Sequence, residues 1–275
     1  MRPMAMRQST SFGETLVNPF RIAGSIINGI AVFVGECTIL LLDSLRRLFT
    51  RPFEAGEIVS QMAFVGVASV PIVALTTFSS GAVIALYTGD ILVRYGASNL
   101  AGGTIALAIA REIAPVLAGI MVAARCGSAM AAQIGTMAVT EQVDALRSLN
   151  VHPTNFLVIP RLIATMTMLP VLALVGMYSG VLGGYLVSVG LSGVSSGSFM
   201  NSIRQFGETS DVTGGLIKTV VFGIVVAVVA CQQGLRTRDG AVGVGRSTTN
   251  TVVITMVLIY VLNYFLTSFL YKTGG

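Results

Sequence analysis

The chain has no tryptophan, a single histidine and few charged residues, and each shortage excludes a class of function. His152 stands alone, so neither a histidine-dependent catalytic triad nor a zinc site can be assembled around it. The three cysteines, Cys37, Cys126 and Cys231, lack the spacing of metal ligands and lie in apolar or helix-end surroundings. We therefore interpret them as packing thiols rather than as a disulfide or a ligand set.

Charged residues form 11% of the chain and apolar residues 53%, whereas soluble domains are about a quarter charged. Several uncharged runs exceed the roughly 18 residues that can cross a bilayer. The composition therefore indicates an integral membrane protein. The net charge of +5 comes mainly from arginine, and no basic run is interleaved with aromatic residues. This pattern favours contact with lipid headgroups over nucleic-acid binding.

The apolar segments predict an all-α integral membrane protein with five transmembrane segments. The first segment is too long for one straight span, and Pro71 and the polar cluster 76–81 interrupt it, so we expect it to be kinked or re-entrant. The third segment is also overlong, with Pro160 near its start and Pro170 inside it. The five segments run over about Ile58–Thr88, Asn99–Ala124, Phe156–Val189, Gly214–Cys231 and Asn250–Tyr271.

The N-terminal part differs from the spans that follow it. Residues 1–20 are polar and are expected to be a mobile cytosolic tail without the apolar core of a signal peptide. Residues 21–52 have apolar positions at helical spacing, but charged side chains such as Glu36 and Asp43 interrupt them. This pattern predicts an amphipathic helix that lies in the membrane interface, with an arm of a membrane-spanning hairpin as the alternative.

The distribution of basic residues predicts the orientation. With the N-terminus in the cytosol, twelve arginines fall on that side and four basic residues on the other, so the positive-inside rule favours a cytosolic N-terminus and an external C-terminus. Arg111 is left inside the membrane. The external residues are Arg94, Arg204, Lys218 and Lys272; the cytosolic ones are Arg2, Arg7, Arg21, Arg46, Arg47, Arg51, Arg125, Arg147, Arg161, Arg236, Arg238 and Arg246.

Two stripes of small residues repeat every four positions, one from Gly119 to Gly135 and one from Gly176 to Gly184. Such stripes let helix backbones approach closely. The sequence leaves open whether the contact lies within one subunit or between subunits.

The polar stretch 134–153 lies between two apolar segments and predicts a short cytosolic helix. Thr140 is a candidate N-cap, Glu141 and Asp144 would occupy the first turns, and Arg147 the last. Val143, Leu146 and Leu149 give the helix an apolar edge. The stretch is either a solvated connection or a docking helix for a soluble partner.

Arg111 and Glu112 are adjacent charges well inside the second segment. Charges at this depth are costly and mark either a structural ion pair or a functional site. Adjacent helical positions do not face each other, so at least one side chain should reach another helix, a cavity or the interface. Residues 240–247 nearly match a phosphate loop, but no strand or nucleotide domain surrounds them, and we interpret them as a flexible cytosolic turn.

The run from Ala110 to Ala164 resembles the signature region of the MlaE/YrbE permease family, whose members serve ABC transporters that work with MCE proteins on lipids. The matching features include Arg111-Glu112 before Pro115, Ile134-Gly135-Thr136-Met137, Glu141-Gln142 with Asp144, and Pro160-Arg161. A second match is Gly243-Val244-Gly245-Arg246 before the last segment. The similarity covers about residues 53–275, with departures at Ala124 and Gln133.

The resemblance implies a permease domain over residues 53–275 that forms a dimer, expected to be a homodimer. It implies a ring of MCE proteins on the outer side and a cytosolic ATPase dimer that binds ATP and magnesium, with no cofactor and no catalytic or metal site in this chain. The coupling residues would be Glu141, Gln142, Asp144, Arg147 and Arg246. Residues lining or flanking a central lipid cavity would be Phe78, Val83, Leu86, Tyr87, Arg111 and Glu112.

The function that the resemblance implies is transport of lipid, expected to be phospholipid, between a bacterial inner membrane and an MCE assembly. Two other classes stay open. An ion-coupled secondary transporter of an apolar substrate would carry its own ion site and often internal repeats, and neither is evident. An intramembrane enzyme would need a nucleophile with a base, or a metal, at membrane depth.

Overall fold

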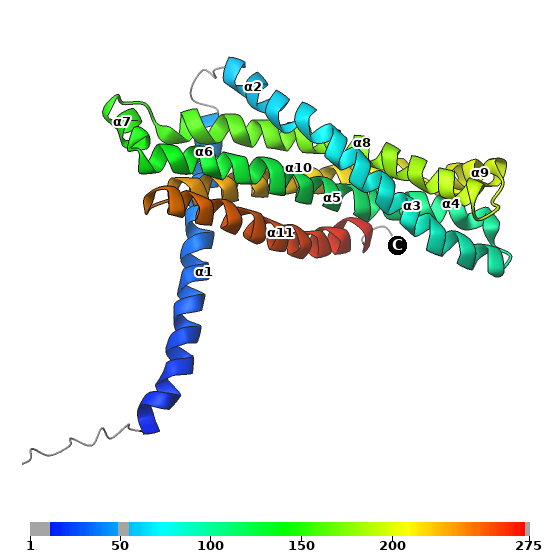
Figure 1. Cartoon of the computed structure of the whole chain (residues 1–275), viewed down its shortest axis with the longest axis horizontal. Helices are drawn as coiled ribbons and strands as arrows, with labels where there is room; N and C mark the ends of the chain where they lie inside the picture. Colours follow the sequence, from blue (N-terminus) through cyan, green and yellow to red (C-terminus); the bar gives the residue numbers. More distant parts are fainter. Residues whose placement is uncertain (1–11, 49–54, 273–275) are drawn as a thin grey trace, which may run out of the picture.

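The computed structural model describes residues 12–48 and 55–272, and nearly all of them are helical. Long helices lie side by side in a bundle, and α1 (Phe12–Leu48) leaves it crosswise (Figure 1). Six helical stretches are long and apolar enough to cross a membrane, and part of α1, residues 27–47, is one of them. The all-α membrane fold is thus confirmed. The interfacial position of residues 21–52 stays a prediction, because the same helix is also long and apolar enough to cross a membrane.

The N-terminal tail is shorter than expected, because α1 begins at Phe12 rather than near residue 21. Residues 1–11 and the end of the expected interfacial segment, 49–52, lie outside the described residues. The end of α1 contacts the bundle through apolar residues: Cys37 and Leu41 pack near Leu162, and Leu40 packs near Val143. The rest of the helix projects away from the bundle (Figure 1).

The first span is broken, as predicted, but the break lies earlier than the polar cluster. It consists of α2 (Ala55–Val65), a 3₁₀ turn η1 (Val67–Ser69) and α3 (Val70–Arg94). Pro71 stands in the first turn of α3, where its missing N–H costs no helical hydrogen bond. The cluster 76–81 stays helical because Thr76 and Thr77 donate hydrogen bonds to carbonyls of the preceding turn.

Arg125 fills the break in the first span. Its Nη1 donates to the Phe64 carbonyl at 3.1 Å and to Ser69 Oγ at 3.0 Å, so it replaces helical hydrogen bonds lost there. Arg125 lies within the candidate span Ser98–Val139, and Arg161 is buried in the candidate span Thr154–Gly190. Neither arginine therefore contributes a free cytosolic charge, as the orientation count had assumed.

The second span is longer than expected and continues to Val139. It contains two π-helical segments, one of which, η3, carries Arg111 and Glu112. Its parts are η2 (Ser98–Leu100), α4 (Ala101–Ala108), η3 (Ile109–Ile113), α5 (Ala114–Val122), η4 (Ala123–Gly127) and α6 (Ser128–Val139).

The remaining elements complete the bundle. The third expected span is the π-helical η5 (Thr154–Val158) followed by α8 (Ile159–Gly190), which runs through Pro170. A short helix, α9 (Ser196–Phe206), was not predicted from the sequence; it packs against α4 at the end of the bundle opposite α7 (Gln142–Ser148) (Figure 1). The last two spans are α10 (Thr209–Leu235) and α11 (Gly240–Lys272), so residues 240–247 are helical rather than a flexible turn.

The small-residue stripes serve packing within the subunit. A side chain added at Gly81 of α3 would meet the Gly180 backbone of α8, and one added at Gly183 would meet the Phe78 carbonyl. Gly119 lies against Phe222 and Ile259. These contacts hold α3, α8 and the last two helices close together, and they resolve the choice that the sequence left open for these glycines.

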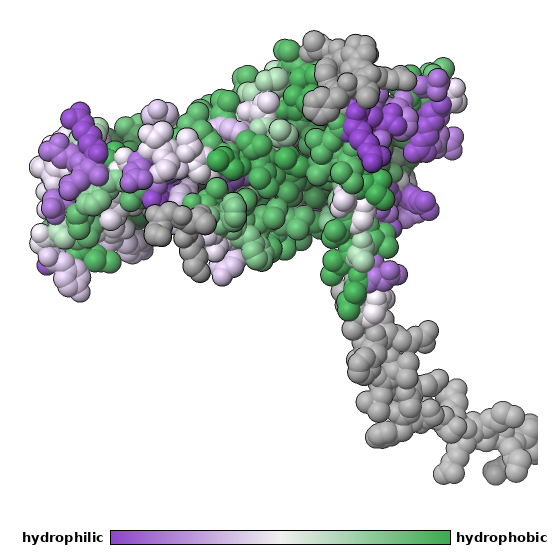
Figure 2. Space-filling view, turned by 180° about the vertical axis from the view of Figure 1, so that it is seen from behind, coloured by the Kyte–Doolittle hydropathy of each residue, from purple (hydrophilic) through white to green (hydrophobic). Residues whose placement is uncertain are grey.

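Figure 2 shows an apolar surface along the middle of the bundle and hydrophilic residues gathered at its two ends. The three cysteines are unpaired thiols, and Cys126 and Cys231 are buried in apolar clusters, which confirms their role in packing. The arrangement fits a bundle that crosses a bilayer along its length, with α7 at one end and α9 at the other (Figure 1).

Candidate functional site

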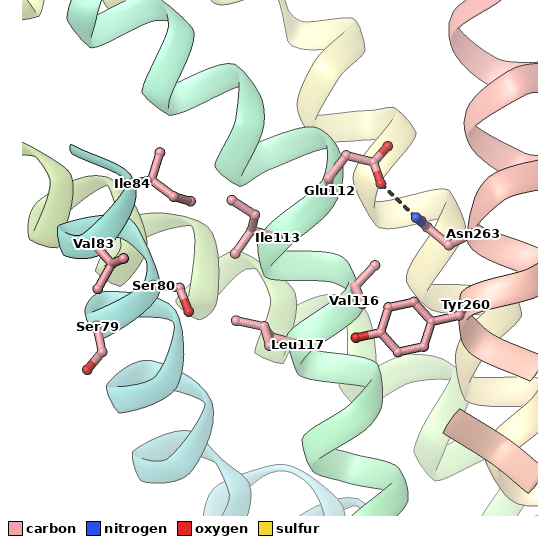
Figure 3. Close-up of a pocket in the computed structure, with 10 residues that line it drawn as sticks. All are labelled: Ser79, Ser80, Val83, Ile84, Glu112, Ile113, Val116, Leu117, Tyr260 and Asn263. Atoms are coloured by element: carbon pink, nitrogen blue, oxygen red, sulfur yellow. Dashed lines mark hydrogen bonds between the residues drawn. The ribbon is translucent and has the colours of Figure 1, made fainter. Parts of the chain in front are cut away.

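An open groove of about 600 Å³ lies between α3, the η3–α5 stretch and α11 (Figure 3). From α3, Ser79, Ser80, Val83 and Ile84 form one wall. Val116 and Leu117 of α5 form the floor, and Tyr260 and Asn263 of α11 form the other wall. The lining is mostly apolar with a few polar groups, which is the usual character of a small-molecule or lipid site.

The carboxylate of Glu112 is the charged group at this groove, and three side chains hold it. Lys218 Nζ of α10 donates to Glu112 Oε1 at 2.8 Å, and Thr267 Oγ1 donates to the same oxygen at 2.8 Å. Asn263 Nδ2 donates to the other oxygen, Oε2, at 2.7 Å (Figure 3). The glutamate therefore joins three helices: η3, α10 and α11.

Arg111 turns away from Glu112 to a second ion pair on α10. Its Nη2 lies 2.5 Å from Asp211 Oδ1, and its guanidinium carbon lies 4.7 Å from the ring centre of Tyr271. Asp211 also accepts a hydrogen bond from the Glu208 N–H and so caps α10. The expectation that the adjacent charges reach other helices is confirmed, since both reach α10.

Two cations and two carboxylates thus neutralise each other inside the bundle. Lys218 is fully buried, and its Nζ also donates to the Arg111 carbonyl at 2.8 Å. Placing Lys218 on the outer side was wrong. Its position within the apolar run 214–231 was the signal that could have placed it inside the bundle. The sequence analysis also missed the other partners of Arg111 and Glu112, which are Asp211, Asn263, Thr267 and Tyr271. Buried charges of this kind are retained only when they are paired.

The six residues predicted to line or flank a lipid cavity fall into two groups. Val83 and Glu112 line the groove. Leu86 and Tyr87 point outward from α3, with exposed fractions of 42% and 71%, and Phe78 packs its backbone against α8. Arg111 belongs to the ion pair with Asp211 rather than to the groove lining. The groove residues that the sequence did not indicate come chiefly from α5 and α11.

The predicted docking helix is shorter than expected. Thr140 ends α6, where its hydroxyl donates to the Thr136 carbonyl, and α7 (Gln142–Ser148) follows after Glu141. Glu141 has φ = 60°, so it forms the turn between the two helices rather than part of the first turn of α7. The prediction that Thr140 caps the helix is therefore wrong. Asn150, with φ = 59°, follows the end of α7 and turns the chain away from it.

One edge of α7 packs on the bundle and the other is exposed. Val143 is buried in a cluster with Ile134 and Leu157, and Leu146 packs against it. Leu149, expected on the same edge, is 73% exposed. The polar side chains of α7 face outward: Glu141, Gln142, Asp144 and Arg147 are exposed, and Arg147 Nη1 pairs with Asp144 Oδ1 at 2.8 Å.

Arg246, the fifth predicted coupling residue, lies elsewhere at the same end of the bundle. It stands in the early turns of α11 and lines a polar pocket at the α10–α11 turn. The structure therefore does not bring Arg246 into the exposed face of α7.

Comparisons with known proteins identify the family. The family model described as "Permease MlaE" matches residues 58–269. A Rickettsia bellii protein named "Probable ABC transporter permease protein" is 42% identical over 245 residues, which is 88% of this chain and 94% of that protein. A Synechocystis protein with a corresponding permease name is 40% identical over 215 residues, 78% of this chain and 82% of that protein.

A plant relative extends the comparison. The Arabidopsis thaliana protein "TRIGALACTOSYLDIACYLGLYCEROL 1, chloroplastic" is 40% identical over 182 residues, which is 66% of this chain and 52% of that protein. The match to the family model covers both the groove and the exposed face of α7. On these grounds, the chain belongs to the MlaE permease family.

Proposed function

We propose that this chain is the permease subunit of an ABC transporter that moves lipid, with phospholipid as the expected substrate, between a bacterial inner membrane and an MCE protein assembly. The observation that supports this proposal best is the open, mostly apolar groove between α3, α5 and α11 (Figure 3). An apolar lining suits acyl chains, whereas a polar solute would need more polar groups to replace its water.

The energy source in this proposal is a separate cytosolic ATPase dimer, which would bind ATP and magnesium. The exposed polar face of α7 suits a soluble partner, since Val143 and Leu146 already fix the helix to the bundle. The same apolar cluster includes Leu157 and Cys231, so a displacement of α7 would be transmitted to η5 and α10. Coupling of two sites requires such a shared element.

The basic residues support a cytosolic position for the α7 end. Arg147, Arg236, Arg238 and Arg246 are exposed on α7 or around the α10–α11 turn, while Arg94 ends α3 and Arg204 lies on α9, which is at the other end (Figure 1). When Lys218, Arg125 and Arg161 are left out, more basic residues still lie at the α7 end than at the α9 end. The positive-inside rule therefore still favours a cytosolic position for α7. The C-terminus is then external.

A second permease copy is part of the proposal. In the most apolar stretch of the candidate span Gly240–Tyr271, only 11% of the residues are buried. Helix α3 also has exposed apolar residues, such as Leu75 and Ile91. Two copies that face each other through this side would enclose their grooves between them. A homodimer requires only this chain, and the MCE ring would then stand over the outer end of the dimer.

Co-purification tests the partner assignment. The full chain would be tagged, isolated in mild detergent and analysed by mass spectrometry and an ATPase assay. We expect ATPase and MCE subunits in the eluate, and loss of the ATPase with Glu141→Lys. Arg204→Gln, on α9 at the opposite end of the bundle, is the control and should retain the ATPase. A chain that purifies alone would refute the assignment.

Lipid retention tests the groove. Val83→Trp would fill it with an indole, while Leu182→Trp places the same ring at an exposed position of α8 that does not line it. We expect quantified co-purifying phospholipid to fall several-fold only in the first variant. Equal phospholipid in both variants would exclude this groove as the lipid site.

The ion-coupled secondary transporter is the competing function. All four charges of the internal network are already paired, and Glu112 accepts three hydrogen bonds. A coupling-ion site would need a carboxylate free to bind the ion. Transport by the purified chain under an ion gradient, without ATPase, would favour this alternative.

A further inference from the structure

A basic pocket of about 370 Å³ lies at the turn between α10 and α11, apart from the groove. Three arginines line it: Arg236 and Arg238 in the turn that follows α10, and Arg246 in the early turns of α11. Asp239 is the only carboxylate among the residues that line this pocket. The lining therefore carries an excess of positive charge.

Two of these arginines have no counter-ion among the residues that the structure describes. Arg236 Nη1 lies 3.4 Å from Glu36 Oε2 of α1. Within residues 12–48 and 55–272, the side chains of Arg238 and Arg246 make no hydrogen bond and no ion pair. Two guanidinium groups thus remain available to an anion, and paired binding of phosphate oxygens is a contact that guanidinium makes well.

The pocket has a fixed inner wall. Thr237 Oγ1 donates to Ser247 Oγ at 2.8 Å and so joins the end of α10 to the early part of α11; both side chains are buried. Helix α11 begins at Gly240 beside the pocket, and the positive end of its dipole adds to the field of the arginines. The hydrogen bond between Thr237 and Ser247 therefore ties together the two helix ends that carry the arginines.

The position of the pocket favours a lipid headgroup. It lies where the candidate spans Thr209–Leu235 and Gly240–Tyr271 end, so it is at the level of the headgroups if these helices cross the bilayer. Val242, in the first turn of α11, is 73% exposed, so an apolar side chain is available to acyl chains beside the basic residues. Basic pockets between membrane helices bind acidic lipid headgroups.

We propose that this pocket binds the phosphate group of an anionic phospholipid from the adjoining leaflet, with Arg238 and Arg246 as its main ligands. Arg236 adds positive charge while it stays paired with Glu36, and Asp239 limits the pocket to one phosphate rather than several. Bound lipid would fix the α10–α11 turn and, through Arg236, the end of α1. This inference does not depend on lipid transport through the groove.

The test is native mass spectrometry of the full chain, purified in detergent and mixed with phosphatidylglycerol or phosphatidylcholine of the same acyl chains. We expect selective retention of phosphatidylglycerol. A basic residue beside an anionic lipid contributes about 1 kcal/mol, equivalent to about fivefold in affinity. Arg238→Gln with Arg246→Gln should therefore lower retention by roughly 25-fold. The matched control, Arg94→Gln with Arg204→Gln, removes the same charge away from the pocket and should change retention little.

Three results would overturn the proposal. Equal retention of phosphatidylglycerol in the pocket variant and the control would show that the lipid binds elsewhere. The chain mixed with phosphatidylcholine could instead bind inorganic phosphate to saturation and show no preference for phosphatidylglycerol. That result would mean that the pocket binds the free phosphate ion. Loss of ATPase co-purification in the pocket variant, with phosphatidylglycerol retention unchanged, would assign these arginines to a protein partner, as predicted for Arg246 from the sequence.

Discussion

Lys218 of α10 is fully buried, and its ammonium group lies 2.8 Å from the carboxylate of Glu112 on η3. The two partners differ in environment, since the Glu112 side chain is 38% exposed towards the groove. This difference means that losing one partner is not equivalent to losing the other. Removing the carboxylate leaves a fully buried cation without a partner, which costs more stability than leaving a half-exposed carboxylate without its cation.

We predict that Glu112→Leu destabilises the protein more than Lys218→Met does. The first substitution leaves Lys218 charged and buried, at a cost of about 3–5 kcal/mol. The second leaves a half-exposed carboxylate that keeps Asn263 and Thr267, at a cost of about 1–3 kcal/mol. Thermal unfolding in detergent would measure the order, and the double variant should be more stable than Glu112→Leu alone. The reverse order would contradict the buried ion pair.

The close approach of α3 and α8 gives a second prediction. Gly81→Ala adds a methyl group that would collide with the Gly180 backbone, so the helices must move apart. We expect a loss of about 1–3 kcal/mol, the usual cost of overpacking. Thermal unfolding should show it. Gly190→Ala is the control, because nothing lies near its added methyl group; equal behaviour of the two variants would exclude the tight contact.

Glu141 gives a third prediction, because its backbone and its charge can be separated. At φ = 60°, Glu141→Gly should relieve backbone strain of about 1 kcal/mol and leave the fold intact. If the carboxylate binds the ATPase, both Glu141→Gly and Glu141→Lys should lose ATPase co-purification while thermal stability is retained. Normal ATPase binding by Glu141→Gly would show that the turn, not the carboxylate, is needed.

The break in the first span gives a fourth prediction. Arg125→Met removes the donors to the Phe64 carbonyl and Ser69 and leaves that carbonyl without its partner. The expected cost is about 1–3 kcal/mol, measured as a lower unfolding temperature. Arg125→Lys keeps one charged donor and should recover part of the loss. No change in Arg125→Met would mean that the arginine does not support the break.

The membrane-spanning helices could be predicted from the sequence, because uncharged apolar runs of this length are typical of transmembrane helices. The sequence also placed a short helix around Asp144 and Arg147. Pro71 did mark the break, which lies at residues 67–69 just before it, but the polar cluster 76–81 did not, because threonines can hydrogen-bond to their own helix. These hydrogen bonds depend on the local backbone geometry, which the spacing of apolar residues does not predict.

The candidate site was less predictable than the spans. Arg111 and Glu112 were conspicuous as charges in an apolar run, but their partners Asp211 and Lys218 are about 100 residues away in the chain. Pairing across such a separation follows from helix packing, which the sequence of one helix does not specify. The groove likewise combines α3, η3, α5 and α11, and only Val83 and Glu112 of its lining were anticipated.

The most direct measurement of the central claim is transfer of a fluorescent phospholipid by the purified permease–ATPase complex in liposomes, with and without hydrolysable ATP. The account predicts transfer that requires ATP hydrolysis, falls several-fold in Val83→Trp and is unchanged in Leu182→Trp. Transfer that needs no ATP, or that is equally fast in Val83→Trp, would contradict a groove-based lipid permease driven by an ATPase partner.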